Sequence, residues 1–285
     1  MCRFVFYQGP PLTLASLLTE PSHSLIKQSI ASKESEEPLN GDGFGVAWYV
    51  HGISDEPAAF RSVTPAWNNM NLLSLARVTR SQTILAHVRA ATSGQPVVEF
   101  NCHPFTHGRY AFMHNGDIGG FATIRRALLS RPSDHAFNAV KGSTDSEHLF
   151  ALFLDHARRA GSMLSASEMA RALVDTVREI SQLQHDAGVT EHNYLNVAVS
   201  DGRCSAVMRY TSDVPENASS LHLHTGRRYV CDGGVCRMVE PEAGQGAAMV
   251  SSEVLSDDPG WQTVKPNSIV LVGEDRRVQT TMVEW

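Results

Sequence analysis

The order in which strand-like and helix-like segments follow one another is the feature that most constrains the fold of this chain. Short β-rich segments bounded by glycine, proline or polar clusters come early, at 3–7, 43–50, 83–89 and 110–114. A helical block follows, and β-rich segments return after residue 190. Strands, then helices, then strands indicate a layered α+β domain rather than alternating βαβ units.

Helical patterns are clearest in the middle of the chain. Apolar residues near 120–130 fall on one face of a helix. Residues 144–147 and 165–168 have the Ser/Thr-x-x-Glu pattern of a capping box, and an apolar stripe at helical spacing follows each of them. We therefore predict three helices whose stripes face the core. Later strands are predicted at 194–200, 206–211, 221–223, 249–254 and 268–272.

Composition excludes several classes of function. The 285 residues are 42% hydrophobic and 19% charged, which is typical of one large globular domain with a sizeable core. The net charge of −6 without a Lys/Arg-rich run argues against a nucleic acid or an anionic membrane as partner. No apolar run approaches membrane-spanning length, and the first residues are too few and too polar for a secretory signal. We expect a cytoplasmic protein.

The five cysteines predict reduced thiols. They are an odd number and lack paired C-x-x-C spacing, which suggests a cytosol-like compartment; a bridge between Cys231 and Cys236 across a hairpin is the less favoured alternative. The segment 102–107 contains residues of metal-ligand type. Because Pro104 breaks any helix that would align them, a loop with hydrogen-bonding histidines is the expected structure. We predict no metal site and no cofactor.

Cys2, directly behind the initiator methionine, is the strongest candidate for a nucleophile. A methionine followed by a small residue is normally trimmed, so we expect the mature chain to begin at Cys2 with a free α-amine. That amine has a pKa of about 7.7–8 and a thiol one of about 8.5, so one residue supplies both a base and a nucleophile. A cysteine at this position also occurs by chance, and the prediction depends on the segments that follow.

Three further segments contain the polar groups that cleavage of a γ-amide requires. Asn115 can offer its side-chain amide to the oxyanion and Gly116 a backbone N–H, in what the sequence predicts as an Asn-Gly turn; losing one such donor costs about a hundred- to a thousandfold in turnover. Arg89 can hold a substrate α-carboxylate through two parallel hydrogen bonds. Asp145 can take the α-ammonium, and Thr92 can add a hydroxyl contact.

Each of these residues also has an ordinary structural explanation. Arg89 can be an arginine at the end of a sheet. Asn115-Gly116 can be only a hairpin turn, which is the commonest use of that dipeptide. Asp145 can stabilise a helix N-terminus through the helix dipole. Taken together, in this order behind an N-terminal cysteine, the residues fit a glutamine-type site better than a set of unrelated structural roles.

These segments resemble the class II glutamine amidotransferases, the N-terminal-nucleophile hydrolases that begin with cysteine. The resemblance is carried by Cys2 and by residues 87–92, 101–104, 114–116 and 143–147. It implies a four-layer αββα fold of two antiparallel sheets, in a single domain spanning 2–285 after removal of Met1. The site residues that it implies are Cys2 as nucleophile with its α-amine as base, Asn115 and Gly116 as oxyanion hole, and Arg89, Thr92 and Asp145 around the substrate.

A narrower resemblance is to the subgroup formed by the amidotransferase subunit of the fungal DUG complex, which degrades glutathione, and its small bacterial relatives. It extends nearly end to end and is weakest near 131–143 and 212–247. It implies a metallopeptidase-like partner subunit. Many synthase-linked members carry tryptophan directly after the clamping arginine, whereas this chain has Ala90, which leaves more room for a leaving group.

The sequence therefore predicts hydrolysis of a γ-glutamyl bond through a thioester at Cys2, with glutathione as the favoured substrate. Alternatives within the same chemistry are a hydrolase of another γ-glutamyl metabolite, as in the ergothioneine pathway, and a plain glutaminase. A non-catalytic binding subunit that keeps the fold and recruits a partner is the alternative from a different class.

Overall fold

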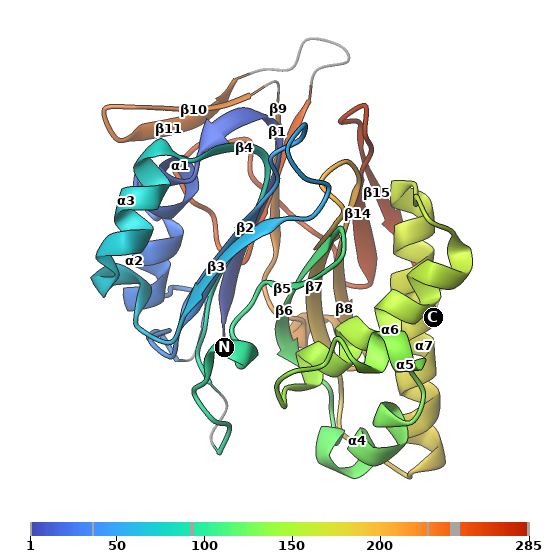
Figure 1. Ribbon diagram of the computed structural model, residues 1–285. Helices are drawn as coiled ribbons and strands as arrows, with labels where there is room; N and C mark the ends of the chain where they lie inside the picture. Colours follow the sequence, from blue (N-terminus) through green and yellow to red (C-terminus); the bar gives the residue numbers. More distant parts are fainter. Residues whose placement is uncertain (1, 36, 92–93, 227, 240–245, 284–285) are drawn as a thin grey trace.

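Two antiparallel sheets lie face to face between two layers of helices in the computed structural model (Figure 1). The structure describes residues 2–35, 37–91, 94–226, 228–239 and 246–283. The expected α+β class and its αββα layering are confirmed. Thr92 lies outside the described residues.

The first sheet has β1 near its centre, and β1 begins directly after Cys2. In this sheet β1 pairs with β12 on one side and with β4 on the other, both antiparallel. The strand order is β13 (Gln262–Thr263), β9 (His222–Gly226), β12 (Ala247–Ser251), β1 (Arg3–Thr13), β4 (Arg80–Val88), β2 (Phe44–Trp48) and β3 (Ala58–Ser62).

The second sheet contains the strand with the Asn-Gly pair. All of its neighbouring strands are antiparallel. The strand order is β15 (Val278–Met282), β14 (Ser268–Val272), β8 (Ser205–Thr211), β7 (Tyr194–Ser200), β6 (Tyr110–Asp117) and β5 (Phe105–His107).

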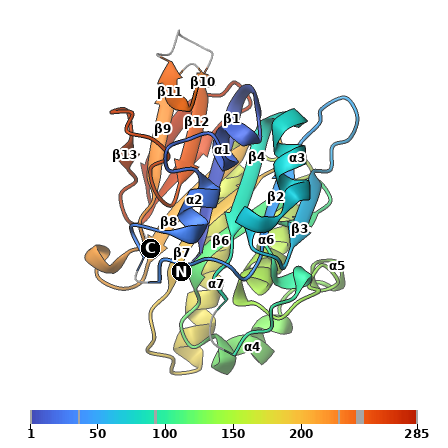
Figure 2. The ribbon, with the colours of Figure 1, turned by 90° about the vertical axis from the view of Figure 1, so that its left-hand side faces the viewer.

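Helices cover the outer face of each sheet (Figures 1 and 2). Those on the first sheet are α1 (Ala15–Leu18), α2 (Leu25–Ile30) and α3 (Met70–Val78). Those on the second are α4 (Phe121–Leu129), α5 (Asp134–Phe137), α6 (Asp145–Ala160) and α7 (Ala166–Asp186). Short 3-10 turns are η1 (Ala66–Asn68), η2 (Glu99–Asn101) and η3 (Pro215–Asn217).

Alternation along β1 shows why this strand can be buried on both faces. Val5 and Tyr7 pack into the core under α1–α3, and Phe4 and Phe6 pack into the core between the two sheets. A third core lies between the second sheet and α4–α7. Because side chains of a strand point alternately to its two faces, an apolar strand without a polar side belongs at the centre of a layered sandwich.

The predicted helix starts are confirmed, and their caps differ. Ser165 and Glu168 form a complete capping box at the start of α7. At α6 the Thr144 hydroxyl accepts from the Glu147 backbone N–H. The Glu147 carboxylate, however, accepts from the backbone N–H groups of residues 141 and 142 instead of reaching back to Thr144. The Glu147 half of the 144–147 pattern therefore fixes the loop before α6.

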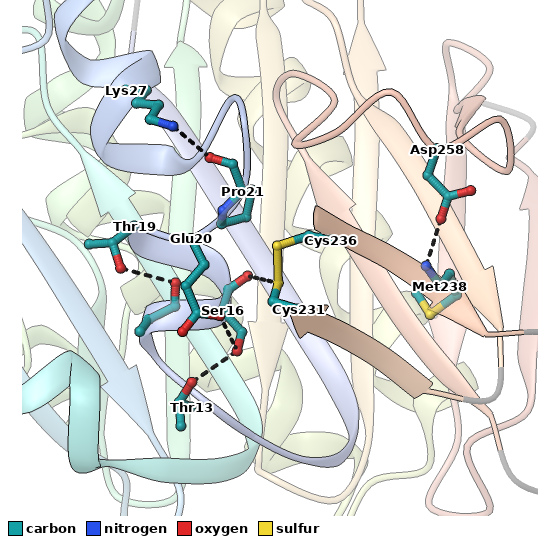
Figure 3. Close-up of a disulfide and its surroundings, with 11 residues drawn as sticks. Thr13, Ser16, Thr19, Glu20, Pro21, Lys27, Cys231, Cys236, Met238 and Asp258 are labelled. Atoms are coloured by element: carbon teal, nitrogen blue, oxygen red, sulfur yellow. Dashed lines mark hydrogen bonds between the residues drawn. A yellow bond between two sulfur atoms is a disulfide. The ribbon is translucent and has the colours of Figure 1, made fainter. Parts of the chain in front are cut away.

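The expectation of reduced thiols at Cys231 and Cys236 is wrong in this structure, which joins them in a disulfide (Figure 3). The two cysteines lie directly opposite each other in the hairpin of β10 (Arg228–Asp232) and β11 (Val235–Val239), with Cα atoms 4.1 Å apart. Gly233 and Gly234, both with positive φ, form the tight turn. The remaining cysteines, Cys2, Cys102 and Cys204, are free.

No helix in the described ranges has both the length and the hydropathy needed to cross a membrane.

Candidate active site

Cys2 lies half-buried where β1 begins, against the backbone that follows β4. The Ala90 N–H donates to its sulfur over 3.4 Å, and the thiol lies 3.4 Å from the Ala90 carbonyl oxygen. Burial raises the pKa of this thiol, and the contact with Ala90 and the charges of Arg89 and Arg3 offset the shift only in part. The thiol is therefore protonated at neutral pH and needs a base to react.

Arg89 follows β4 directly and is 3% exposed. Its Nη1 and Nη2 atoms each donate to the Pro96 carbonyl oxygen over 3.4 Å. Its backbone is fixed by Gly43, whose carbonyl accepts from Arg89 N, and by Asp42, whose N–H donates to Arg89 O. Two guanidinium donors of Arg89 thus share one acceptor, each at the long distance of 3.4 Å. A carboxylate offers two oxygens and can replace these contacts with shorter, charge-assisted hydrogen bonds.

Asn115 and Gly116 lie inside β6, so the expectation of an Asn-Gly turn is wrong. They pair with Asn196 and Leu195 of β7, and the strand continues to Asp117. Gly116 has φ 142°, and a Cβ at this position would lie 1.7 Å from the Tyr194 carbonyl oxygen. Strand pairing overrides the local turn preference of the dipeptide here, and only glycine fits beside β7.

Asp145 begins α6 and is 8% exposed. Its Oδ2 accepts from the Ile118 N–H over 2.9 Å, and its Oδ1 accepts from the Ser146 N–H over 2.8 Å. The Ser146 hydroxyl lies 2.8 Å from His114 Nδ1, beside Asn115. The carboxylate is therefore oriented toward the end of β6 as well as placed at a helix N-terminus, where the dipole favours negative charge.

Hydrogen bonds join these residues into one site. Cys2 contacts Ala90, which directly follows Arg89. Phe4, two residues after Cys2, donates through its backbone N–H to the Ser252 hydroxyl over 3.1 Å, and Asn115 Nδ2 lies 3.4 Å from the same oxygen. Of the predicted site residues, Cys2, Arg89, Asn115, Gly116 and Asp145 are thus placed at the same end of the sandwich, and Thr92 is outside the described residues.

Ser252 and Glu253 belong to this site, and the sequence argument gave them no role. Glu253 is 1% exposed and forms an ion pair with Arg3, which follows the nucleophile, at 3.2 Å between Oε1 and Nε. Burial alone would raise the pKa of Glu253, but its hydrogen bonds lower it to about 2. The donors are His23 Nε2 at 2.6 Å, the Ser32 hydroxyl at 2.5 Å, and the backbone N–H groups of Lys33 and Glu34 at 3.0 Å each.

The signal in the sequence was a pair of polar residues, Ser252 and Glu253, directly after the apolar strand β12. Ser252 and Glu253 are buried, and Phe4 and His23, which they bind, lie more than 200 positions away in the sequence. A polar pair that ends a buried strand is expected to satisfy some distant group, but the sequence alone does not say which one.

Two buried histidines, His87 and His103, lie beside the segments that carry Arg89 and Asn115. His87 Nε2 donates to the His114 carbonyl oxygen over 3.2 Å, and the ring of His103 lies against that of His87 with centroids 4.4 Å apart. Burial lowers the pKa of His87 to about 3 and that of His103 well below its usual value. The charged form of both imidazoles is therefore disfavoured, which makes them weak proton acceptors, and the hydrogen bonds of the Cys2 sulfur go to Ala90 rather than to either ring.

One group of side chains among the described residues has the types and the spacing of metal ligands. The donor atoms of Glu20, Cys231 and Cys236 lie within 4.8 Å of one another. The two sulfur atoms are bonded to each other, and the hairpin that carries them lies at the far end of the first sheet from Cys2 (Figures 1 and 3). Disulfide sulfur is not a thiolate ligand, so this group does not form a metal centre as it stands.

Comparison with known sequences identifies similar proteins. The family model described as glutamine amidotransferases class-II matches residues 16–284. The chain is 40% identical to the probable glutamine amidotransferase DUG3 of Saccharomyces cerevisiae, over 95% of this chain and 82% of that protein. It is 27% identical to the gamma-glutamyl-hercynylcysteine sulfoxide hydrolase of Mycolicibacterium smegmatis, over 99% of this chain and 100% of that protein.

Comparison with solved structures supports the same fold. A glutamine aminotransferase class-II domain protein from silicibacter pomeroyi superposes with a TM-score of 0.67 at 29% identity, over 99% of both chains. The glutamine phosphoribosylpyrophosphate amidotransferase of B. subtilis superposes with a TM-score of 0.60 at 12% identity, over 99% of this chain and 49% of that one. At this low identity the second likeness concerns the fold alone.

Proposed function

Because the chain belongs to the class II glutamine amidotransferases, an amidohydrolase family, we propose that it cleaves the γ-glutamyl bond of glutathione with Cys2 as nucleophile. Two connections support this proposal. The Cys2 thiol contacts the backbone of Ala90, which directly follows Arg89. Phe4, two residues after Cys2, is hydrogen-bonded to Ser252, which in turn contacts Asn115. The proposed mature enzyme is a single domain of residues 2–285 in the cytoplasm, without Met1.

The first chemical step uses both functional groups of Cys2. The α-amine takes the thiol proton, and the thiolate attacks the γ-carbonyl carbon to give a tetrahedral oxyanion. Asn115 Nδ2 and the Gly116 N–H are proposed to stabilise this oxyanion.

The second step releases the two products in turn. The ammonium formed on Cys2 returns its proton to the leaving amine, the C–N bond breaks, and a γ-glutamyl thioester remains. Water, deprotonated by the same amine, attacks the thioester and releases glutamate. In this scheme Arg89 binds the α-carboxylate, Asp145 binds the α-ammonium, and Thr92 adds a hydroxyl contact.

Glutathione is preferred over glutamine because of the leaving group. Both compounds present the same free α-amino and α-carboxylate groups, so one set of binding residues serves both. The backbone of Ala90 contacts the Cys2 sulfur, and its methyl side chain is much smaller than the tryptophan that many synthase-linked amidotransferases carry after the arginine, which favours a larger leaving amine. The similarity to DUG3 supports this choice, and we propose that a metallopeptidase-like partner subunit contributes to activity.

A panel of substrates tests the proposal. The purified chain, alone and with candidate partner subunits recovered by pull-down from its host, is assayed for glutamate release from glutathione, glutamine and other γ-glutamyl amides. Glutathione is expected to be cleaved best. Strong cleavage of glutamine without cleavage of glutathione would instead establish a glutaminase. Preference for a γ-glutamyl amide of a cysteine sulfoxide would instead place the chain with its gamma-glutamyl-hercynylcysteine sulfoxide hydrolase relative.

Intact mass distinguishes the enzyme from a non-catalytic binding subunit. A protein that retains Met1 has its Cys2 nitrogen in a peptide bond, so the proposed base is absent. We expect the mass of the purified chain to correspond to residues 2–285.

Substitution of Ala90 by tryptophan is expected to reverse the substrate preference. The indole would occupy the space next to the Cys2 sulfur, so kcat/KM for glutathione should fall by about tenfold or more relative to that for glutamine. Ala90→Ser, which adds little volume, is the matched control and should retain the original ratio. An unchanged ratio in the tryptophan variant would show that the leaving group does not pass Ala90.

A further inference from the structure

Ser252 is placed to connect the nucleophile's strand with the oxyanion site. It follows β12 directly and is fully buried. Its backbone N–H donates to the Phe4 carbonyl oxygen over 3.0 Å, and its hydroxyl oxygen accepts from the Phe4 N–H over 3.1 Å. The position of Ser252 is therefore fixed relative to a residue two positions after Cys2.

The same hydroxyl touches the Asn115 carboxamide. Asn115 Nδ2 lies 3.4 Å from Ser252 Oγ, while Asn115 Oδ1 is buried and has no partner in the described part of the chain. An unpaired buried acceptor is unfavourable. The two ends of a carboxamide have the same shape, so rotation of the group exchanges Nδ2 and Oδ1 without any change in packing, and the hydrogen-bond partners decide the orientation.

The hydrogen-bonding capacity of Ser252 favours the rotated orientation. A hydroxyl has one hydrogen to donate and lone pairs that accept. One lone pair of Ser252 is used by the Phe4 N–H, and its hydrogen reaches no acceptor identified among the described residues. Donation of that hydrogen to Asn115 Oδ1 satisfies both groups. It also turns the Nδ2 hydrogens to the side where Oδ1 now stands unpaired.

We propose that Ser252 is a positioning residue for the oxyanion hole: its hydroxyl holds Asn115 Oδ1, so that Nδ2 faces the carbonyl oxygen of the substrate. This inference rests on the proposed function, since it assigns the freed amide hydrogens to the oxyanion formed by attack of Cys2. No covalent change occurs at Ser252. It acts only through the orientation of Asn115.

The neighbouring residue makes the arrangement rigid. Glu253 holds the Arg3 side chain, so consecutive residues after β12 bind consecutive residues of β1, one through a side chain and one through the backbone. Asn115, the proposed oxyanion donor on the second sheet, is thereby linked to the start of β1, which directly follows Cys2. Ser252 and Glu253 together hold Phe4 and Arg3, and Ser252 also contacts Asn115.

Ser252→Ala tests the proposal, with Ser251→Ala as the matched control. Ser251, the last residue of β12, is equally buried, and its hydroxyl also binds Phe4, donating to the carbonyl oxygen over 3.2 Å, but the hydrogen bond to Asn115 is made by Ser252. We expect kcat of Ser252→Ala to fall about ten- to a hundredfold with KM within about threefold, because a misoriented donor acts in the transition state. Ser251→Ala should retain kcat within about threefold.

Combination with Asn115→Ala separates positioning from a general structural effect. If Ser252 acts through Asn115, Ser252→Ala should slow the Asn115→Ala enzyme by less than about twofold. Multiplicative losses in the double variant, or equal losses in Ser251→Ala and Ser252→Ala, would overturn the inference. Ser252→Cys keeps a weaker donor of similar size, and the same pattern with a smaller loss in kcat is expected if the alanine variant does not fold.

The unfolding midpoints of the same proteins distinguish failure of this inference from failure of the proposed function. If the wild-type chain cleaves no γ-glutamyl compound, the proposed function is rejected. The wild type, the two single variants and the double variant then still report on the contact. Non-additive shifts of the midpoint support the Ser252–Asn115 hydrogen bond, and additive shifts refute it.

Discussion

Replacement of Cys2 by alanine is expected to slow release of glutamate from γ-glutamyl substrates by at least about a thousandfold, because loss of a nucleophile removes the covalent route altogether. Alanine is also small enough for removal of Met1, so the variant keeps its α-amine and loses only the sulfur. The sulfur makes its hydrogen-bond contacts with the backbone of Ala90, so folding should be little affected.

Two measurements check this expectation. Steady-state assays give the loss in kcat, and intact mass after mixing with substrate shows a γ-glutamyl adduct on the wild type but not on Cys2→Ala. Cys204→Ala is the control, since Cys204 is another free cysteine, buried in the turn between β7 and β8. It should retain activity within about threefold of wild type. Full activity in Cys2→Ala would reject covalent catalysis at this position.

Replacement of Glu253 by alanine is expected to lower the free energy of unfolding by about 3–5 kcal/mol at pH 7. The substitution leaves the buried Arg3 without its counter-ion and leaves the N–H groups of residues 33 and 34 without their acceptor. Removing one member of a buried ion pair costs more than the pair itself contributes, because an uncompensated charge remains. Denaturant unfolding monitored by tryptophan fluorescence measures the change.

The dependence on pH follows from the lowered pKa of Glu253. The folded-state pKa is about 2, below the usual value of 4.5, so the carboxylate stabilises the fold fully above pH 4.5. This contribution is lost as the pH falls from 4.5 toward 2. The unfolding free energies of wild type and Glu253→Gln should therefore converge over that window, since the wild-type side chain becomes neutral as well.

A pair that is more exposed to solvent provides the control for Glu253. His156 and Glu179 form a similar His–Glu contact, at 3.0 Å between α6 and α7, but their side chains are 15% and 25% exposed. Glu179→Ala should cost no more than about 1 kcal/mol. Equal effects of the two substitutions would show that the Glu253 network adds nothing beyond an ordinary surface pair.

Local patterns in the sequence predicted the helices α4, α6 and α7 and most of the strands, but not α1, α2, α3 or α5. The boxes at 144–147 and 165–168 mark the starts of α6 and α7, because a cap depends on residues only three positions apart. The strands β2, β4, β6, β7, β8, β12 and β14 lie within or across the predicted β-rich segments. The resemblance supplied the four-layer packing, which local periodicity does not contain.

Strand pairing and tertiary contacts, which local sequence patterns do not show, explain the features that the sequence argument missed or mistook. Asn115-Gly116 has the composition of a turn but is held extended by β7. Cys231 and Cys236 lie in a hairpin within the segment where the resemblance was weakest, and their direct opposition follows from the register of β10 and β11. Ser252 acquires its partners only when the last third of the chain closes on β1. The pairing of Asn115-Gly116 and the contacts of Ser252 depend on residues far away in the sequence, whereas the disulfide depends on the register of a short hairpin.

The position of β1 between β4 and β12 has a consequence for biosynthesis. At about 5–20 residues per second, β1 leaves the ribosome roughly ten to fifty seconds before β12 is translated. During that interval the strand has only one of its two eventual neighbours, and the groups that organise its first residues have not been made. A chain released before β12 thus lacks Ser252 and Glu253, so the backbone of Phe4 and the buried guanidinium of Arg3 are left without their final partners.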